Sequence, residues 1–235
     1  MKRSKPINTE LLKPIEPLTP AQELLWEQYT LGKNLVAYGC AGTGKTFCLL
    51  YQALKEVLTE STPYEKIYIV RSLVPTREIG FLPGTHEDKS YLYQIPYRNM
   101  VKHMFSMYTD KEFESLYDDL QRQETISFWS TSFLRGTTLD NAIIIVDEFE
   151  NLNFHELDSI MTRVGENSKI FFAGDASQSD LLKVTERTGI LDFMQILNGM
   201  PEFSKVEFGL EDIVRSGLVR SYLVSKINQG YDENI

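Results

Sequence analysis

Gly39-Cys40-Ala41-Gly42-Thr43-Gly44-Lys45-Thr46 is the stretch that decides the fold of this chain. It fits the phosphate-binding pattern G-x-x-x-x-G-K-[ST] at every fixed position. The apolar residues before it, 35–38, predict a strand, and those after it, 47–54, predict a helix. Glycines let the backbone bring its N–H groups close to an anion, and the positive end of a helix adds to the attraction. The stretch therefore predicts a nucleoside triphosphate site, in which Lys45 reaches the β- and γ-phosphates and Thr46 holds Mg²⁺. A glycine-rich turn with a chance lysine would not explain the flanking strand and helix.

The composition is that of an ordinary globular protein of 235 residues, long enough for one α/β domain. A net charge of −9 counts against a large basic groove for nucleic acid. A local basic surface stays open, because five cations share one stretch: Arg71, Arg77, Lys89, Arg98 and Lys102. Both cysteines fall in or just after the glycine-rich stretch, which favours a reducing compartment over a disulfide framework. With no membrane-length apolar run and no signal-peptide core, we expect a cytoplasmic protein without a membrane partner.

Strands and helices alternate along the chain. We expect strands at 35–38, 66–71, 125–129, 142–146, 169–173 and 205–208. The expected helices are one opened by Thr19 and Pro20, one at 47–54, two within 91–123, and others at 152–164, 188–198 and 212–227, with an irregular loop at 72–90. This alternation predicts an α/β fold with a mainly parallel sheet. Residues 1–16 are expected to form a flexible arm, 17–235 one domain, and about 75–125 a loop and helical insertion within it.

Acidic residues follow the most apolar of these strands. Asp147 and Glu148 come at its end, where ligands of parallel α/β sheets bind. Asp147 is expected to hold Mg²⁺, mostly through water, and Glu148 to polarise a water aimed at the γ-phosphate. That pair indicates hydrolysis. The alternative is an acidic pair that merely begins the next helix.

Two glutamines are further candidates. Gln178 follows the strand expected at 169–173, where its amide can contact the γ-phosphate or the attacking water. Gln22 precedes the glycine-rich stretch, and its amide can pair with the edge of an adenine. Taken alone, each would be read as a turn residue or a solvated helix residue.

Together these segments resemble the PhoH-like ATPases, relatives of the superfamily 1 helicase core. The resemblance runs from Pro17 to about Lys226. Besides the phosphate-binding stretch it rests on 18–22, on Gly-Phe-Leu-Pro-Gly at 80–84, and on 134–139, 147–151, Met-Thr-Arg-Val-Gly at 161–165, 174–180 and 212–215. It implies a RecA-like P-loop NTPase with three α/β/α layers, ATP and Mg²⁺ as cofactors, and a ring, often of six subunits. The nucleotide contacts that we expect are Gln22, Gly39 to Phe47 and Arg135.

The resemblance also carries expectations about biology. Some relatives are described as RNA helicases, the family name comes from phosphate-starvation induction, and a compact copy of this kind is typical of bacteriophages, which would place it in the host cytoplasm. The chain departs from the family pattern in having Cys40 in place of proline, Phe149-Glu150 in place of Ala-Gln, and Arg71-Ser72 in place of Arg-Pro. Glu150 lies beside the catalytic carboxylates, so that change bears on any link between hydrolysis and nucleic acid.

Phosphoryl transfer usually needs a cation on the γ-phosphate beyond the loop lysine and Mg²⁺. The candidates are Arg135, Arg163 and Arg215. The chain has no room for a second RecA-like domain, so we expect a homo-oligomeric ring in which Arg163 or Arg215 acts on a neighbouring subunit. The alternative for each arginine is a pairing with surface carboxylates.

Three functions follow as hypotheses. The first is an ATPase motor on RNA or single-stranded DNA. The residues expected to contact the nucleic acid are Arg71, Arg77 and three tyrosines, Tyr91, Tyr93 and Tyr97. These tyrosines can stack bases, although core packing is the more common use. The second is a nucleotide-gated assembly or scaffold protein with a protein partner and no helicase activity. The third is a small-molecule kinase, which must keep water out.

Overall fold

The computed structural model describes residues 7–72, 86–131, 136–175 and 184–229, without the side chains of 86–91 and 184–188. Within them six parallel strands form one sheet in the order β3-β2-β4-β5-β1-β6. The strands are β1 (Asn34–Gly39), β2 (Lys66–Arg71), β3 (Ile126–Ser130), β4 (Ala142–Asp147), β5 (Lys169–Gly174) and β6 (Phe203–Phe208). The phosphate-loop strand β1 is therefore separated from β4, the strand of the acidic pair, by β5.

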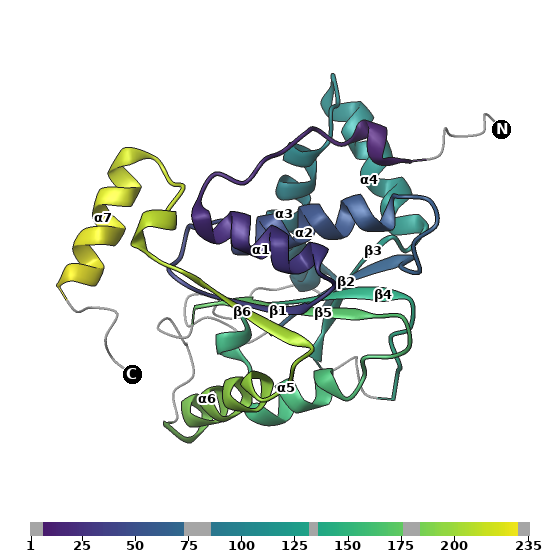
Figure 1. Ribbon diagram of the computed structural model, residues 1–235. Helices are drawn as coiled ribbons and strands as arrows, with labels where there is room; N and C mark the ends of the chain where they lie inside the picture. Colours follow the sequence, from purple (N-terminus) through teal and green to yellow (C-terminus); the bar gives the residue numbers. More distant parts are fainter. Residues whose placement is uncertain (1–6, 73–85, 132–135, 176–183, 230–235) are drawn as a thin grey trace.

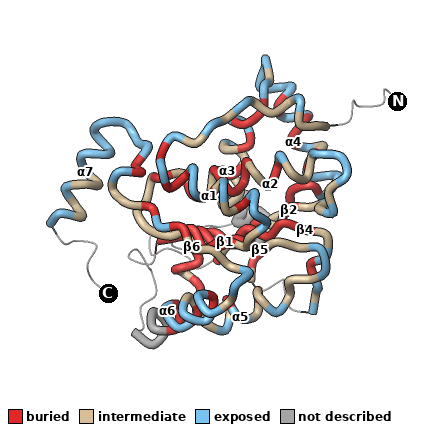
Figure 2. The backbone as a smooth tube through the Cα atoms, in the orientation of Figure 1, coloured by how far each residue is buried: buried red, intermediate tan, exposed pale blue. Residues whose placement is uncertain are grey.

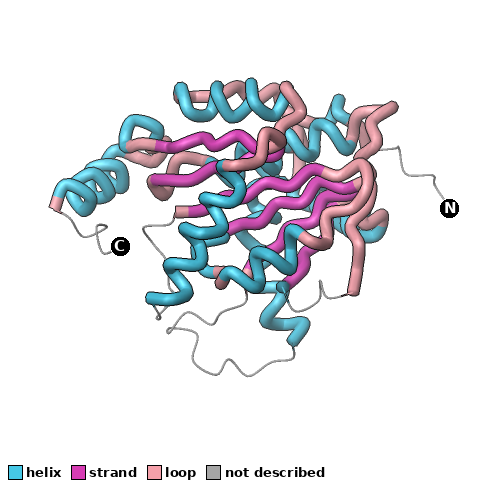
Figure 3. Tube along the Cα trace, turned by 60° about the horizontal axis from the view of Figure 1, so that its bottom comes forward, coloured by secondary structure: helices cyan, strands magenta, loops and turns pink. Residues whose placement is uncertain are grey.

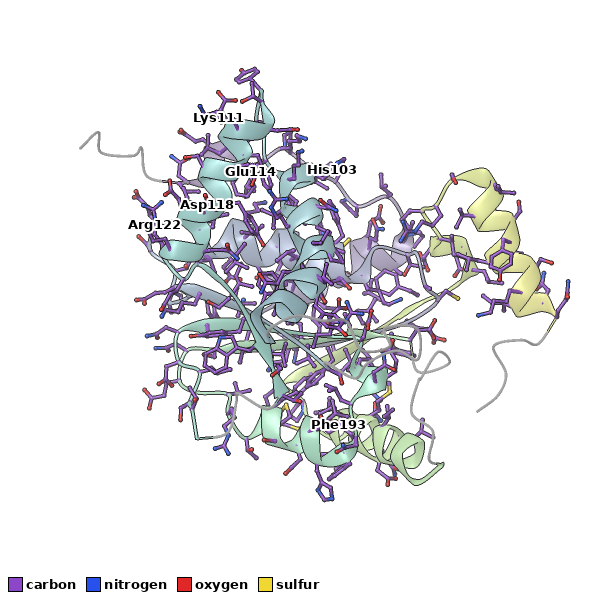
Figure 4. All side chains as sticks on the ribbon, turned by 180° about the vertical axis from the view of Figure 1, so that it is seen from behind. His103, Lys111, Glu114, Asp118, Arg122 and Phe193 are labelled. Atoms are coloured by element: carbon purple, nitrogen blue, oxygen red, sulfur yellow. The ribbon has the colours of Figure 1, made fainter. Side chains whose placement is uncertain are left out.

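Helices cover both faces of the sheet, and the layers are visible in Figures 1 and 3. One face carries α1 (Pro20–Thr30), α2 (Lys45–Val57), α3 (His86–Met104) and α4 (Asp110–Arg122). The other carries α5 (Phe154–Met161) and α6 (Val184–Asn198). In Figure 4, seen from behind, His103 of α3 and Phe193 of α6 lie on opposite sides of the sheet. The predicted three-layer α/β/α fold with a parallel sheet is confirmed.

The core is split by the sheet into two apolar layers, and the buried backbone runs along the strands in Figure 2. All six residues of β4 are buried, with Ile143 and Ile145 in one layer and Ile144 and Val146 in the other. A strand covered on both faces needs apolar side chains at every position, which is why this strand was the plainest in the sequence.

The first helix begins as its sequence predicts. Thr19 is in the extended region and its hydroxyl accepts a hydrogen bond from the N–H of Gln22. Pro20 occupies the first helical position, where the missing N–H has no intrahelical partner to lose. Side chains at Leu25 and Tyr29 then lie on the buried face. This start fixes the segment that runs beside the phosphate loop.

Residues 7–16 differ from the expected flexible arm. The N–H of Lys13 donates to the carbonyl of Met104, and the N–H of Ser106 donates to that of Leu11. Apolar side chains of this segment, Ile7, Leu11, Leu12 and Ile15, pack against the core. The charged and proline-bearing segment also has an apolar residue every few positions, and these residues pack against the core layer. Backbone groups of the segment bond to Tyr51 of α2 and to Met104 of α3.

The region expected as an insertion also differs. Part of the irregular loop expected at 72–90 is helical, because α3 begins at His86. Both α3 and α4 bury apolar faces in the same layer as α1 and α2. They form the crossover between the parallel strands β2 and β3, so they complete a layer of the domain instead of adding to it. The outer side of α4 is charged, and Figure 4 shows it with Lys111, Glu114, Asp118 and Arg122.

The last helix, α7 (Gly217–Asn228), lies to the side of the sheet in Figure 1 and buries none of its residues. It starts five residues later than expected. Asp212, read as its first residue, instead accepts hydrogen bonds from the N–H groups of Gly209 and Ala21. No helix in the described part of the chain is both long and apolar enough to cross a membrane.

Candidate functional site

The glycine-rich stretch forms a loop between β1 and α2, and two of its glycines are required by close neighbours. Gly39 has φ +111°, and a Cβ there would lie 2.3 Å from the carbonyl oxygen of Phe208 in β6. Gly42 has φ +76°, and a Cβ there would lie 2.8 Å from Cγ of Arg215. Both backbones therefore adopt conformations that favour glycine, with no room for a side chain. The N–H of Cys40 donates to the Phe208 carbonyl at 2.9 Å, a bond that proline could not make.

Lys45 is folded back on the loop. Its Nζ donates to the carbonyl oxygens of Gly39 at 2.8 Å and Cys40 at 2.6 Å, and lies 5.7 Å from the centre of the Phe208 ring. Burial lowers the pKa of this ammonium group, and nearby Asp175 opposes the shift. The loop thus satisfies its own charge without an anion. A phosphate would take over donors that now contact backbone carbonyls.

Asp147 at the end of β4 reaches the first turn of α2. The Thr46 hydroxyl donates to its Oδ1 at 2.7 Å, and the hydroxyl of Tyr97 from α3 donates to its Oδ2, also at 2.7 Å. Tyr97 is 2% exposed, so its ring is a core residue and is not available for base stacking. Burial, followed by the Asp147 charge, raises the Tyr97 pKa well above its usual value. Asp147 is held by hydrogen bonds from two elements.

The residues at this point fit a metal that arrives with a nucleotide. Thr46 and Asp147 supply one hydroxyl and one carboxylate, and no group of three or more metal-ligating side chains occurs among the described residues. Mg²⁺ in phosphoryl-transfer sites keeps several waters and is bound by one or two carboxylates together with the phosphates. The donor set matches that pattern and would not hold an ion alone.

Glu148 follows in the left-handed region, with φ +51°, and its side chain leaves the sheet in a different direction. Its Oε2 lies 2.5 Å from Nη2 of Arg71, the last residue of β2. The Arg71 guanidinium also lies over the ring of Tyr93, 5.7 Å from its centre. Burial raises the pKa of the Glu148 carboxyl, and Arg71 opposes that rise.

Glu150 is the buried carboxyl of the site. It is 6% exposed and lies over Gly174 at the end of β5, where a Cβ would be 2.0 Å from its Oε2. Burial raises its pKa to about 8, against hydrogen bonds from the backbone N–H groups of Glu150 and Asp175. It is therefore mostly protonated at neutral pH. A neutral acid has the shape and charge of the glutamine that the family pattern places here, so the departure at 150 is smaller than the sequence indicated.

The buried Glu150 carboxyl makes the stability of the fold depend on pH. Because its folded-state pKa is raised from 4.5 to about 8, its contribution to stability is complete below pH 4.5 and is lost as pH rises through 8. Relative to Glu150→Gln, the wild-type free energy of unfolding should fall by about 3–5 kcal/mol over that window. Urea unfolding of the two nucleotide-free proteins at a series of pH values measures the difference. A difference that does not change with pH would contradict a protonated Glu150.

A cavity of about 620 Å³ opens beside the loop. Its walls come from the segment before α1, from α1 itself, from the first turns of α2 and from α3, and include Glu16, Trp26, Phe47, Met100 and His103. Gln22 also lines it. The Gln22 Oε1 accepts from the N–H of Leu18 at 2.8 Å, and its Nε2 donates to the Thr43 carbonyl at 2.9 Å. The amide thus ties the segment before α1 to the loop, keeping one N–H and one lone pair for a base. Adenine contact by Gln22 stays a prediction.

The candidate arginines lie in different places. Arg215 covers its own loop at Gly42, held by a backbone bond from the Val214 N–H to the Gly42 carbonyl at 3.1 Å. Arg163 follows α5 at the edge where the strands begin, opposite to Lys45, and its buried Nε has no hydrogen-bond partner within the described residues. Of the two candidate arginines that the structure describes, Arg215 lies at the loop and Arg163 does not. Arg135 and Gln178 lie outside the described residues.

Sequence reasoning missed the roles of Tyr97 and Glu150, and that of Arg71 as a partner of Glu148. For Tyr97 a signal existed, because Tyr97, Val101 and Met104 are spaced as one buried helix face. For the other two no local pattern exists, since their partners come from other strands.

The chain matches known proteins over most of its length. The family model described as "PhoH-like protein" matches residues 14–227. "Protein PhoH2" of Bacillus subtilis is 34% identical over 144 residues, which cover 60% of this chain and 31% of that protein. A "PhoH-like protein" of the same organism is 30% identical over 197 residues, covering 83% of this chain and 57% of that one. The chain thus spans 31% and 57% of the length of these two relatives.

One solved structure shows the level of structural similarity. The DUF1998 helicase MrfA, in a crystal structure bound to DNA, superposes with a TM-score of 0.49 at 11% identity, over 81% of this chain and 27% of that one. The fold assignment rests on the chain's own sheet and layers. The family model and the two relatives agree on one family, and the chain's own loop pattern indicates a nucleotide-binding protein of the P-loop NTPase class.

Proposed function

The chain belongs to the PhoH-like protein family, and we propose that it is a Mg²⁺-dependent ATPase that acts as an oligomeric motor on RNA or single-stranded nucleic acid. The observation that carries the ATPase part is the contact between Thr46 and Asp147, 2.7 Å apart at the phosphate loop. It brings the two Mg²⁺ ligands of a phosphate-loop site together from different elements.

The chain's own residues have separate tasks in this proposal. Lys45 exchanges the carbonyls of Gly39 and Cys40 for phosphate oxygens. Thr46 and Asp147 would hold Mg²⁺, and a bound ion would supply positive charge beside the phosphates. Glu148, one residue beyond Asp147, accepts a proton from the attacking water once it is free of Arg71. Arg215 adds positive charge over the loop, and Gln178 senses the γ-phosphate.

Coupling to a substrate rests on separate observations. The motif set that resembles the superfamily 1 helicase core favours a nucleic acid, and Arg71 with Tyr93 forms a cation and ring pair near the end of β2. A nucleotide-gated scaffold with a protein partner is the second candidate. It is favoured by the net charge of −9 and by apolar residues exposed on α7, Leu218 at 84% and Tyr222 at 65%. The same helix supports assembly of identical subunits into a ring, in which Arg163 would act on a neighbouring site.

The test is a panel of phosphate-release rates with ATP and Mg²⁺. Rates are measured alone, with single-stranded RNA, with single-stranded DNA and with duplex DNA, at low and high salt. The motor predicts stimulation by single strands that weakens as salt rises, because phosphate contacts release counterions. No stimulation at low salt by any nucleic acid would leave the scaffold, and phosphate release without an acceptor rules out the kinase. Size-exclusion with light scattering on the same sample measures the assembly.

A further inference from the structure

Arg71 connects the catalytic carboxylates to the neighbouring strand. It is the last residue of β2 and lies opposite Asp147 in the strand register. Its side chain is 24% exposed, and that of Glu148 is 38% exposed, so the pair is half-sheltered from water. At 2.5 Å the two groups form a charge-assisted hydrogen bond, which is stronger and more directional than an ion pair through water.

The sheet order shows on which side of β4 the contact with Arg71 holds Glu148. In the order β3-β2-β4-β5-β1, strand β2 lies on the side of β4 that is away from β1 and its phosphate loop. Asp147 is drawn toward the loop by Thr46, whereas Glu148 is drawn toward β2 by Arg71. The two adjacent carboxylates are therefore held on opposite sides of the end of β4. The contact with Arg71 places Glu148 on the side away from where a γ-phosphate binds.

Helix α3 holds Arg71 in this position. The ring of Tyr93 lies under its guanidinium, and one turn later Tyr97 donates to Asp147. Met100 and His103, on the following turns, line the cavity beside the loop. Helix α3 thus contacts Arg71, which holds Glu148, and also forms part of the wall of the proposed nucleotide cavity.

We propose that Arg71 is a positioning residue that restrains Glu148 away from the attacking water, so that hydrolysis waits until this ion pair opens. The inference rests on the proposed ATPase function. Opening the pair frees the Glu148 side chain to turn from β2 toward the loop, where the proposed ATPase places the attacking water. Arg71 does not touch the reacting atoms.

The test compares Arg71→Gln with the wild type in the absence of nucleic acid. The basal turnover number should rise about two- to fivefold, the population change that a pair of this exposure supports. KM should stay unchanged, because Arg71 does not contact the nucleotide. The basal turnover number of Arg71→Lys, which keeps the charge, should rise less than that of Arg71→Gln. Arg98→Gln is the matched control, because Arg98 lies on α3 but pairs with Glu114 beyond the site, and its rate should equal that of the wild type.

A second readout does not depend on hydrolysis. The thermal midpoints of nucleotide-free wild type, Arg71→Gln, Glu148→Gln and the double variant form a cycle, which should be non-additive if the two groups interact. Additive shifts would overturn the inference, and so would a basal rate in Arg71→Gln that is equal to or below that of the wild type. Hydrolysis in the wild type without any rise in Arg71→Gln overturns the restraint alone. Absence of hydrolysis from both proteins overturns the ATPase proposal together with it.

Discussion

Glu148→Gln is expected to lower the turnover number for ATP hydrolysis by about 10²- to 10⁴-fold, the usual contribution of a positioned general base. Nucleotide affinity should change little, because the phosphates are held by the loop, Lys45 and Mg²⁺. Glutamine keeps the size of the glutamate side chain. The left-handed backbone at 148 costs the two residues about the same, so the substitution adds no backbone strain. Single-turnover phosphate release and binding of a fluorescent ATP analogue separate the two effects.

Glu166→Gln is the matched control for that substitution. Glu166 is an exposed glutamate near the start of β5, at the sheet edge opposite to the loop, and its change should leave the rate unaltered. A Glu148→Gln enzyme with wild-type turnover would show that another group accepts the proton. A variant that binds no nucleotide would instead show that Glu148 holds the site together, and its thermal midpoint would then fall as well.

The strands were the most predictable part of the fold. The bounds of β2 at 66–71 and the start of β4 at 142 agree with the sequence expectation, because apolar runs ended by polar residues are local signals. The sheet order was not predictable in the same way. It depends on which strands each crossover brings together, and no window of the sequence contains that information.

Helix ends show how distant contacts override local ones. Asp212 looked like the first residue of a helix, yet its carboxylate accepts from Gly209 nearby and from Ala21, 191 positions earlier. That long-range bond joins the turn after β6 to the start of α1. The true helix therefore starts at Gly217. Only the folded chain reveals that the capping group at 212 belongs to another element.

The candidate site was likewise predictable where its signals are local and unpredictable where distant residues meet. The loop, Asp147 and Glu148 were predicted as site residues from residue type and spacing, since phosphate chemistry demands such residues in that pattern. The pair between Arg71 and Glu148 was not, because it joins neighbouring strands 77 positions apart in the sequence. The protonation of Glu150 was not predictable from the sequence either, because it depends on burial at the end of β5, which raises the pKa of this carboxyl to about 8.

Lys45→Ala is expected to weaken nucleotide binding by about 10- to 150-fold, the effect of losing charge-assisted hydrogen bonds worth about 1.5–3 kcal/mol. Turnover should fall further, because the lysine charge contacts the oxygens on which charge develops. In the free protein the same ammonium group donates to the carbonyls of Gly39 and Cys40. Its removal therefore also exposes these carbonyls to water in the open cavity, where water can replace the lost donors.

Because water can replace the hydrogen bonds that Lys45 donates, the folded protein should tolerate Lys45→Ala. The thermal midpoint of nucleotide-free Lys45→Ala should stay close to that of the wild type, while the stabilisation that added ATP and Mg²⁺ give to the wild type should shrink. Lys55→Ala is the matched control, because Lys55 is exposed on the same helix, three turns away. Undiminished stabilisation of Lys45→Ala by nucleotide would place the phosphates elsewhere. A large fall in the thermal midpoint of Lys45→Ala without nucleotide would show that the lysine mainly stabilises the loop. Its bonds to the carbonyls of Gly39 and Cys40 would then matter more than contacts with phosphate.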